Sequence, residues 1–458
     1  MFAGREAELR KLEGIFESKK FECVIIHGRW RAGKTSLIRE FIKKKKAIFF
    51  SAQEIGSGEN LKYLADCIGA FPQEPDAKKI RIGSYGDALE QLFRLTRTER
   101  VVFVIDDYQF LAASHRDISR LICEQIDRRL IDSRLMLVVC GSSPLVMERE
   151  ALSYSSPFHG RRTAKIEVAP FTFSEARRHF GGFSPYDIAI MYGVTGGVPK
   201  YLGHMDPGLP VEENIRRAML DPSSPLFEEP ANILRLEVRD LTFYNAILTA
   251  IASGLTKNSE IAGAVGLETS ACTAYLKNLI ALGIVSKHTP ITEKAGKKTL
   301  YEIGDGFFRF WYRFIPHNMS LIQAGMASKI WRGVASGIPS FMHTVFEDIC
   351  RQWLQQANLA GQLPARFVEF GRWWGVDPVW KDAASLPIVA YSDNSHALFA
   401  DCVWSDEPAH SGALVSLAER SRLFRYAHKH LYLFSRSGFS SECAESASRV
   451  GANLVLFE

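Results

Sequence analysis

Short apolar runs alternate with amphipathic stretches over the first third of the chain. The apolar runs are rich in β-branched and aromatic residues and predict strands at residues 23–27, 47–51, 101–105 and 135–140. Between them, apolar residues recur with helical spacing, notably over residues 35–43 and 87–96. Strands that alternate with helices are typical of βαβ units. Residues 1–170 therefore predict an α/β domain with a parallel sheet.

The pattern changes after this domain. Residues 171–235 have helical periodicity interrupted by glycine pairs and prolines, which predicts a small helical lid. Residues 236–305 show three helical patterns and then two short strands around a tip rich in lysine and glycine, the order found in a winged helix. An aromatic linker helix region, 306–339, leads to a last region, 340–458, in which helix and strand signals mix.

Composition places the chain among ordinary globular proteins. Hydrophobic residues make up 47% and charged residues 23% of its 458 residues, which argues against disorder and against collagen-like repeats. The net charge of +5 is mild, so it permits a nucleic-acid partner without arguing for one. The eight cysteines form no CxxC pair and lie mostly in apolar runs, as buried thiols of a reducing compartment do. No uncharged apolar run reaches spanning length, so we expect a cytoplasmic protein without membrane insertion.

The strongest chemical signal follows the first predicted strand. The sequence Gly28-Arg-Trp-Arg-Ala-Gly33-Lys34-Thr35 matches GxxxxGK(S/T) between a strand and a helix, the context of a phosphate-binding P-loop. Glycines let backbone N–H groups close around a β-phosphate, Lys34 neutralises β/γ oxygens, and the Thr35 hydroxyl ligates Mg²⁺. We therefore expect ATP and Mg²⁺ as ligands, with the nucleotide held by residues Gly28, Arg29, Trp30, Arg31, Ala32, Gly33, Lys34, Thr35 and Ser36.

Two later strand ends complete the expected catalytic site. The strand at 101–105 ends in Asp106-Asp107, where Asp106 would hold the magnesium and Asp107 would orient the attacking water. Taken alone, such an acidic pair is more often a solvated strand end, so its weight comes from the P-loop. After the strand at 135–140, Ser142 either senses the γ-phosphate or belongs to a simple turn.

These motifs together resemble a known family. The chain is similar to the prokaryotic AAA-like ATPases of the STAND type, often called archaeal ATPases, which join a P-loop module to a winged helix and a C-terminal domain distantly similar to PD-(D/E)xK nucleases. Besides the P-loop and Val-Ile-Asp-Asp, the resemblance rests on Phe2-Ala-Gly-Arg-Glu, Cys-Gly-Ser-Ser, Ser156-Pro-Phe-His-Gly-Arg-Arg-Thr163, Gly196-Gly-Val-Pro-Lys-Tyr-Leu202 and Glu369-Phe-Gly-Arg-Trp-Trp374. It implies an α/β fold: a P-loop NTPase parallel sheet with a helical lid, followed by a winged helix and a C-terminal α/β nuclease-like domain.

The resemblance also implies roles for residues outside the P-loop. Phe2 and Arg5 would lie near the adenine, and Pro199 would close the lid over it. Arg161 or Arg162 would reach a γ-phosphate, in the same subunit or across a homo-oligomer contact. A surface salt-bridge pair is an equal alternative for these two arginines.

The chain departs from the family pattern at two places. Asp107 stands where the family usually has glutamate, so hydrolysis should be slow while binding stays intact. In the C-terminal region Glu347 matches the family's helix glutamate and Asp401 lies near the right place. Pro387, however, stands at the expected aspartate and Val403 at the expected lysine. We therefore expect a degenerate nuclease-like domain.

Three hypotheses about function remain. The first is an ATP-driven or ATP-switched regulator, in which the nucleotide state repositions the winged helix and the C-terminal domain, with protein partners bound by the C-terminal domain. The second is a DNA-binding protein in which ATP is secondary; its candidate contacts are Ser270, Thr273, Tyr275, Lys277 and Asn278 on a recognition helix and Lys287, His288, Lys294, Lys297 and Lys298 on the wing. That helix has no arginine, so winged-helix scaffolding of the ATPase is a comparable reading. The third, a nucleotide-gated nuclease, is disfavoured by the missing residues.

Overall fold

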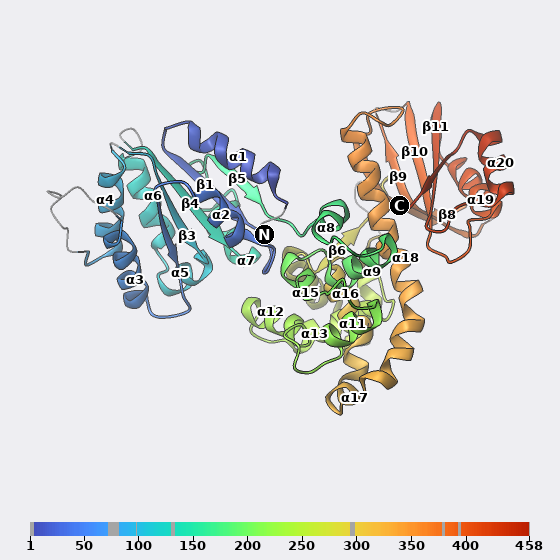
Figure 1. The fold of residues 1–458 in the computed structure, drawn as a ribbon, viewed down its shortest axis with the longest axis horizontal. Helices are drawn as coiled ribbons and strands as arrows, with labels where there is room; N and C mark the ends of the chain where they lie inside the picture. The colour runs from blue at the N-terminus through green and yellow to red at the C-terminus, as the bar shows by residue number, and fades with distance from the viewer. Residues whose placement is uncertain are drawn as a thin grey trace. The chain divides into compact units, whose positions relative to one another are not determined.

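The computed structural model describes residues 4–71, 82–97, 99–129, 133–293, 298–377, 381–392 and 395–457. The chain forms two compact units (Figure 1). The first comprises Met1–Phe171 together with two short later segments, Val198–Lys200 and Leu236–Val238. The second comprises Thr172–Gly197, Tyr201–Arg235 and Arg239–Glu458. The sequence did not predict that the two short segments belong to the first unit.

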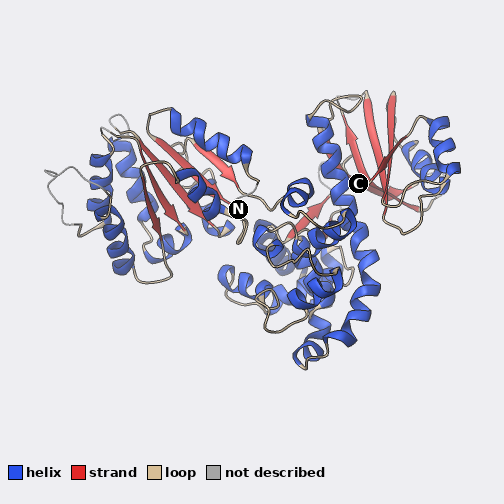
Figure 2. Cartoon of the chain, in the orientation of Figure 1, coloured by secondary structure: helices blue, strands red, loops and turns tan. Residues whose placement is uncertain are grey.

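A five-stranded parallel sheet forms the centre of the first unit (Figure 2). Its order is β2-β3-β4-β1-β5, and every neighbouring pair is parallel. The four strands predicted from sequence are confirmed to within one residue at each end, whereas β5 was missed because its short polar run buries only Ile166. The strands are β1 (Glu22–His27), β2 (Ala47–Ser51), β3 (Val101–Asp106), β4 (Leu135–Gly141) and β5 (Ala164–Glu167).

Helices cover both faces of this sheet. Successive strand residues point to opposite faces, so Cys23 and Ile25 belong to one buried cluster while Val24 and Ile26 belong to the other. The second cluster is covered by α1 (Glu6–Glu17) and α2 (Lys34–Ile42). The first is covered by α3 (Ser57–Gly69), α4 (Tyr85–Leu95), α5 (Tyr108–Ser114) and α6 (Ile118–Arg129). A sheet buried on both faces explains the nearly continuous apolar runs of its inner strands.

The parallel topology gathers functional loops at one edge. All five strands end at the same edge, and ligands of open α/β sheets bind there. The loop after β1 carries the P-loop, β3 ends at Asp106, and the loop after β4 precedes α7 (Pro144–Met147) and the π-helical turn Glu148–Leu152. The edge therefore brings together the three segments that the sequence analysis singled out.

Helices dominate the start of the second unit. The predicted lid region contains α8 (Phe173–His179), α9 (Pro185–Thr195), α10 (Pro199–Leu202), α11 (Val211–Met219) and α12 (Glu229–Glu237). Of these, the first two residues of α10 and the last two of α12 belong to the first unit. The next segment contains α13 (Thr242–Ala252), α14 (Asn258–Val265) and α15 (Thr269–Ala281), followed by the antiparallel pair β6 (Val285–His288) and β7 (Leu300–Ile303). These elements follow the order predicted for a winged helix. Lys294 and Lys297 of the expected wing tip lie outside the described residues.

The C-terminal part of this unit is built on a second five-stranded sheet of order β12-β11-β10-β9-β8. Strands β8 (Glu369–Val376), β9 (Ala383–Tyr391) and β10 (His396–Val403) are antiparallel neighbours, while β10, β11 (His428–Ser435) and β12 (Asn453–Leu456) are parallel. The helices here are α16 (Gly306–Phe314), the 3-10 turn Pro316–Asn318, α17 (Met319–Gln323), α18 (Ala327–Leu359), α19 (Ser411–Ser421) and α20 (Ser441–Val450).

Helix α18 runs across a boundary that the sequence analysis had placed between residues 339 and 340. The helix continues through Pro339 and buries side chains on both sides of it, including Ile338 and Phe341. The end of the linker region, from residue 327, and the start of the C-terminal domain are therefore one helix.

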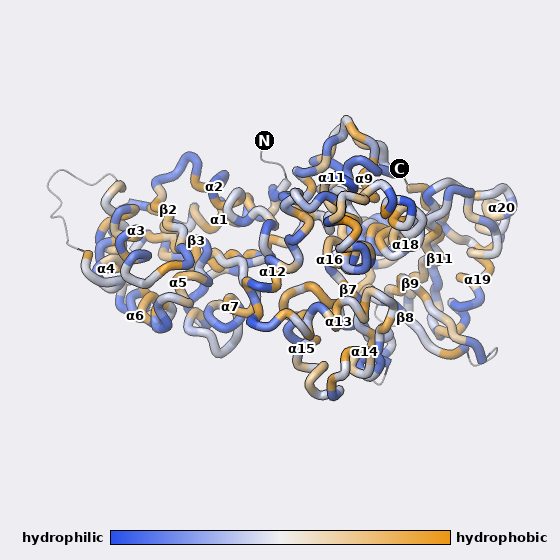
Figure 3. The backbone as a smooth tube through the Cα atoms, turned by 90° about the horizontal axis from the view of Figure 1, so that it is seen from below, coloured by the Kyte–Doolittle hydropathy of each residue, from blue (hydrophilic) through white to orange (hydrophobic). Residues whose placement is uncertain are grey.

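Hydrophobic and hydrophilic positions are interspersed along the backbone of both units (Figure 3). Among the described residues, no helix combines the length and the apolar character needed to cross a bilayer.

Candidate nucleotide-binding site

The backbone of the P-loop requires glycine at both ends of the motif. Gly28 has φ 152°, and a Cβ atom there would lie 2.2 Å from the carbonyl oxygen of Val168. Gly33 has φ 92° and is the residue before helix α2. The loop therefore turns tightly between the end of β1 and the start of α2. Backbone N–H groups at the amino end of a helix favour a bound phosphate.

Lys34 lies beneath this loop with only 5% of its surface exposed. Its Nζ donates hydrogen bonds to the carbonyl oxygens of Gly28, at 2.9 Å, and Arg29, at 2.7 Å. Burial lowers the pKa of Lys34, while the nearby carboxylates of Asp106 and Asp107 oppose that shift. The loop thus fixes a cationic side chain among carbonyl groups, ready to interact with phosphate oxygens.

Thr35 and Asp106 meet at the start of α2. Thr35 Oγ1 donates a 2.7 Å hydrogen bond to Asp106 Oδ2, and Asp106 is 2% exposed. A hydroxyl and a carboxylate are hard oxygen donors, which suit Mg²⁺, an ion that uses one or two protein ligands and takes the rest from phosphates and water. In the part of the chain that the structure describes, no cluster of three or more His, Cys, Asp or Glu side chains could hold a metal ion. The donor set therefore fits Mg²⁺ bound together with a nucleotide.

Asp107 is held by a residue that the sequence analysis missed. Asp107 has φ 51° and its carboxylate accepts a 3.1 Å hydrogen bond from Gln109 Nε2. Burial and then the neighbouring Asp106 carboxylate raise the pKa of Asp107. Gln109 Oε1 in turn accepts a 3.0 Å bond from the backbone N–H of Ser142. Gln109 therefore couples the second carboxylate to the loop after β4.

Glu237 is a second unpredicted member of the site. It ends α12 in the short segment Leu236–Val238 that belongs to the first unit. Its carboxylate accepts hydrogen bonds from Trp30 Nε1, at 2.9 Å, and from Ser143 Oγ, at 2.7 Å. Ser143, rather than the predicted Ser142, thus places its hydroxyl in this network. Glu237 lies far along the chain and in no motif, so no sequence pattern indicated it directly. The one indirect signal was its partner Ser143, which follows the predicted Ser142.

Of the three residues expected near the adenine, the structure describes Arg5 and Pro199, and both approach the P-loop. Arg5 is buried: its Nη2 donates to the carbonyl oxygens of Ala32, at 3.1 Å, and Ala169, and its guanidinium lies 4.8 Å from the centre of the Phe171 ring. A Cβ atom added at Gly33 would lie 4.0 Å from Pro199 Cγ, so Pro199 approaches the loop. Phe2 lies outside the described residues.

Three further polar residues of the predicted nucleotide-binding set differ in their exposure. Arg31 and Ser36 are exposed, and Arg29 is half-buried. Arg31 has φ 70°, so the loop holds a left-handed conformation at a residue other than glycine.

The structure does not bring Arg161 and Arg162 to the P-loop of the same chain. Both precede β5, whose first residue, Ala164, pairs with Val24 near the start of β1. Strand β1 then runs on to the P-loop, roughly 13 Å further at the rise of a strand. Arg161 forms a two-pronged ion pair with Asp127, at 2.7 and 2.8 Å. Arg162 donates to the carbonyl oxygens of Ala151 and Leu152. If either arginine acts on a nucleotide, it must therefore act on one bound by a neighbouring subunit.

In the second unit, the expected nuclease-like position Glu347 is engaged by arginine. Arg372 on β8 donates to Glu347 Oε2, at 3.0 Å, and to Glu302 Oε2 of β7, at 2.7 Å. Pro387 lies in β9, Asp401 and Val403 lie in β10, and burial raises the pKa of Asp401. Glu347 thus belongs to an ion-pair network that joins β7, α18 and β8.

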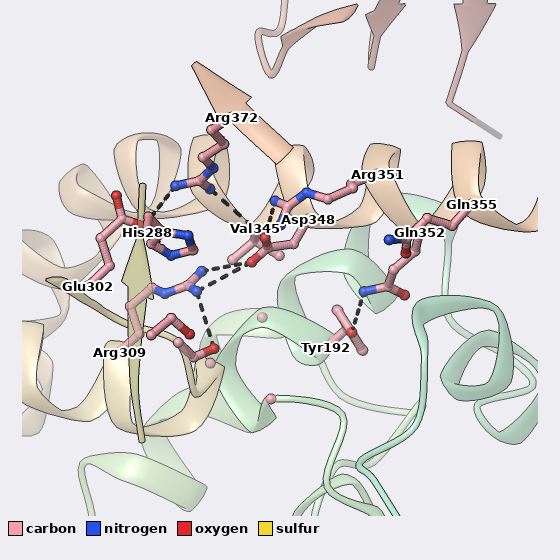
Figure 4. A pocket seen from close by; sticks show the side chains of 15 residues that line it. Tyr192, His288, Glu302, Arg309, Val345, Asp348, Arg351, Gln352, Gln355 and Arg372 are labelled. Atoms are coloured by element: carbon pink, nitrogen blue, oxygen red, sulfur yellow. Dashed lines mark hydrogen bonds and ion pairs between the residues drawn. The ribbon is translucent and has the colours of Figure 1, made fainter. Parts of the chain in front are cut away.

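The same network contains a half-buried carboxylate surrounded by guanidinium groups. Figure 4 shows Arg309, Arg351 and Arg372 converging on Asp348, with the contacts of Arg309 at 3.3 Å and Arg351 at 2.6 Å. These side chains line a cavity of about 340 Å³ within the second unit. Each guanidinium group has a carboxylate within ion-pair distance, but Arg309 and Arg351 share Asp348, so the cavity lining holds three arginines against the two carboxylates Glu302 and Asp348.

Comparisons with known proteins agree with this site. Residues 2–205 match an ATPase domain found predominantly in Archaea, and residues 311–415 match archaeal and bacterial proteins of unknown function. An uncharacterized protein of Methanocaldococcus jannaschii is 30% identical over 408 residues, 89% of this chain and 88% of its own. An uncharacterized ATP-binding protein of the same organism is 44% identical over 46 residues, 10% of this chain and 78% of its own.

A solved structure shows the same fold. The Walker-type ATPase of Pyrococcus abyssi superposes with a TM-score of 0.53 at 20% identity, over 68% of this chain and 96% of its own.

Proposed function

This chain belongs to the archaeal-type P-loop ATPase family, and we propose that it binds ATP with Mg²⁺, hydrolyses ATP slowly and uses the nucleotide state to control its winged-helix and C-terminal segments. The observation that supports the nucleotide site most directly is the 2.7 Å contact of Thr35 with Asp106 beside the buried Lys34. Motif, strand ends and donor chemistry agree at one edge of the sheet.

Each residue of the site has a role that follows from its position. The backbone N–H groups of the loop and the start of α2 bind the β-phosphate, and Lys34 neutralises charge on the β/γ oxygens. Thr35 and Asp106 hold Mg²⁺, which when bound neutralises charge that develops on the phosphates. Asp107 orients the attacking water while Gln109 fixes its carboxylate. Because aspartate reaches less far than glutamate, this orientation is imperfect and hydrolysis is slow.

DNA binding by the winged-helix segment is the weaker candidate, since most of its candidate side chains within the described residues already have partners. Thr273 accepts a bond from Asn258, and Asn278 donates to Tyr244. Tyr275 packs against two aromatic rings, His288 pairs with Glu302, and Lys298 pairs with Glu293. Ser270 and Lys277 on α15 and Lys287 on β6 are exposed. A control function exerted through protein contacts therefore fits these side chains better.

Calorimetry tests the nucleotide-binding part of the proposal. The full-length protein should bind ATP in the presence of Mg²⁺, and Lys34→Ala should weaken that binding by roughly 10- to 100-fold, as expected when a hydrogen bond to a charged group is lost. Lys44→Ala is the matched control because Lys44 is exposed beyond the end of α2. Equal affinities of Lys34→Ala and the wild type would refute the assignment.

Copurification tests the regulatory part. Proteins that are retained by the wild type with ATP, but not by Lys34→Ala, would identify the partners of the nucleotide-bound state. An identical set of partners with and without nucleotide would contradict control by the nucleotide state. A salt-dependent shift of DNA would instead favour the second candidate.

A further inference from the structure

Glu237 connects the two loops of the nucleotide site to the start of the winged-helix segment. One carboxylate oxygen accepts from Trp30 in the P-loop and the other accepts from Ser143 in the loop after β4. Glu237 is the last residue of α12, and α13 begins five residues later at Thr242. A change in the Glu237 contacts is therefore transmitted by the covalent chain to the connection between α12 and α13.

Lys34, the residue expected to bind the terminal phosphates, also acts electrostatically on the Glu237 carboxylate. Burial raises the pKa of Glu237, whereas its two hydrogen bonds and the positive charge of Lys34 lower it. Lys34 is also the residue that neutralises the terminal phosphates of a P-loop nucleotide. A γ-phosphate at the P-loop and the Glu237 carboxylate would both be anions within electrostatic reach of this buried cation. In a partly desolvated site, two such anions raise each other's free energy.

A cleft beside Glu237 leaves room for its contacts with Trp30 and Ser143 to change. Trp30, Phe110, Ser143 and Leu236 line a cleft of about 370 Å³ in the first unit. The indole ring of Trp30 and the end of α12 can thus shift into this cleft without displacing a packed core.

We propose that Glu237 is the positioning residue through which the γ-phosphate of a bound nucleoside triphosphate acts on the α12–α13 connection. This inference rests on the proposed binding of nucleotide at the P-loop. A triphosphate opposes the contacts of Glu237 with Trp30 and Ser143, and a diphosphate, which lacks the γ-phosphate, leaves them in place. By thermodynamic linkage, the same coupling lowers the affinity of the wild type for the triphosphate relative to the diphosphate.

The first test compares Glu237→Gln with the wild type in calorimetric titrations of ADP and a non-hydrolysable ATP analogue, each with Mg²⁺. Glutamine removes the charge but can still accept from Trp30 and donate to Ser143. We expect the affinity for the ATP analogue relative to ADP to rise about tenfold, within the usual range of coupling between sites. The matched control is Glu228→Gln, because Glu228 is exposed just before α12 and should leave the ratio unchanged.

The second test uses the wild type alone and reports on the connection itself. Hydrogen exchange of the α12 amides should be about tenfold faster with the ATP analogue than with ADP. In Glu237→Gln the two nucleotides should give equal exchange. A residue with a purely structural role would change exchange equally in both nucleotide states.

The outcomes separate this inference from the proposed function. If the wild type binds both nucleotides but α12 exchanges at the same rate with each, the inference is overturned and nucleotide binding stands. An unchanged affinity ratio in a folded Glu237→Gln also overturns it. If the wild type binds neither nucleotide, the proposed function itself fails.

Discussion

Thr35 Oγ1 donates a 2.7 Å hydrogen bond to Asp106 Oδ2, which joins the start of α2 to the end of β3. Strand β4 lies between β1 and β3 in the sheet, so the contact spans the width of one strand. The parallel direction of all three strands makes this possible, because their last residues share one edge. The order of the sheet thus brings together a hydroxyl and a carboxylate from residues that are distant in sequence.

This pair predicts a magnesium-specific defect for Thr35→Ala. The variant removes the hydroxyl that we propose as an Mg²⁺ ligand and leaves Lys34 and the loop backbone in place. We expect affinity for ATP to fall about tenfold with Mg²⁺ and to change little with chelator. Calorimetry under both conditions measures the difference. Thr35→Ser, which keeps the hydroxyl, is the control and should retain most of the affinity. An equal loss with and without Mg²⁺ would argue against a metal ligand.

Asp107→Glu should accelerate hydrolysis. The longer side chain extends the carboxylate by one methylene towards the attacking water, and Gln109 stays available as its partner. We expect about a tenfold increase in the single-turnover rate, because small errors of alignment are costly in such steps. Affinity for ATP should remain near that of the wild type. If Asp107→Glu turns over no faster than the parent, the reach of the carboxylate is not the limitation.

The sequence predicted those parts of the site that depend on local pattern. The P-loop and Asp106 each adjoin a strand whose apolar run is visible in the sequence, so their meeting at one edge followed from the expected parallel sheet. Gln109 and Glu237 follow no local pattern and enter the site only through tertiary contacts, from a short helix and from the end of α12. Arg161 illustrates the opposite case. Its motif suggested contact with the nucleotide, but β5, which the sequence analysis missed, places it where the strands begin.

Because Arg161 and Arg162 lie away from the P-loop of their own chain, we predict that either one can accelerate hydrolysis only at the site of a neighbouring subunit. ATPase activity per molecule should then rise with protein concentration, since an arginine supplied from a neighbouring subunit accelerates hydrolysis by ~10³-fold or more. Arg161→Ala or Arg162→Ala should remove this increase. The control is Arg120→Ala, an exposed arginine of α6. Mixing Lys34→Ala, which supplies arginines but hydrolyses poorly, with the affected arginine variant should restore activity. Wild-type activity in both arginine variants would exclude the role.

Asp348→Asn should strongly destabilise the second unit. Burial alone would raise the pKa of Asp348, but the guanidinium groups of Arg309, Arg351 and Arg372 outweigh it and hold the pKa below its ordinary value of 3.8. Removing the carboxylate leaves Arg309 and Arg351 without their shared partner in a partly buried network, which should cost more than the ~1 kcal/mol of an exposed pair and at most about 3–5 kcal/mol of unfolding free energy. Urea unfolding measures this change. Asp406→Asn removes an exposed carboxylate paired with Arg436 and should cost less than about 1 kcal/mol.

The same depressed pKa fixes the sign of the pH dependence. The Asp348 carboxylate contributes its full stabilisation above the unfolded pKa of about 3.8, and the contribution is lost as the pH falls through the lower folded pKa. The difference in stability between the wild type and Asp348→Asn should therefore shrink in acid. A difference that stays constant from neutral pH down to pH values well below 3.8 would contradict this account.

The C-terminal domain should not cut DNA. Hydrolysis of a phosphodiester at a site of this type needs carboxylates to hold a divalent metal and a lysine to help position or activate water. Glu347 is instead held by Arg372 at 3.0 Å, in a network that also includes Glu302 and Asp348. Pro387 offers no metal ligand, and Val403 can neither donate nor accept a proton. The ion pairs of Arg372 with Glu302 and Glu347 join β7, α18 and β8.

Incubation of the full-length protein with single- and double-stranded DNA, Mg²⁺ or Mn²⁺, and ATP tests this expectation. We expect no cleavage by the wild type, and we expect Glu347→Ala to lower the free energy of unfolding, because it leaves Arg372 with one buried partner fewer. A matched variant is Asp401→Ala, which removes the other carboxylate near the expected site but takes no part in the Arg372 network. Cleavage that either substitution abolishes would show that the two carboxylates form an active metal site, and the ion pair with Arg372 would then have to open during the reaction.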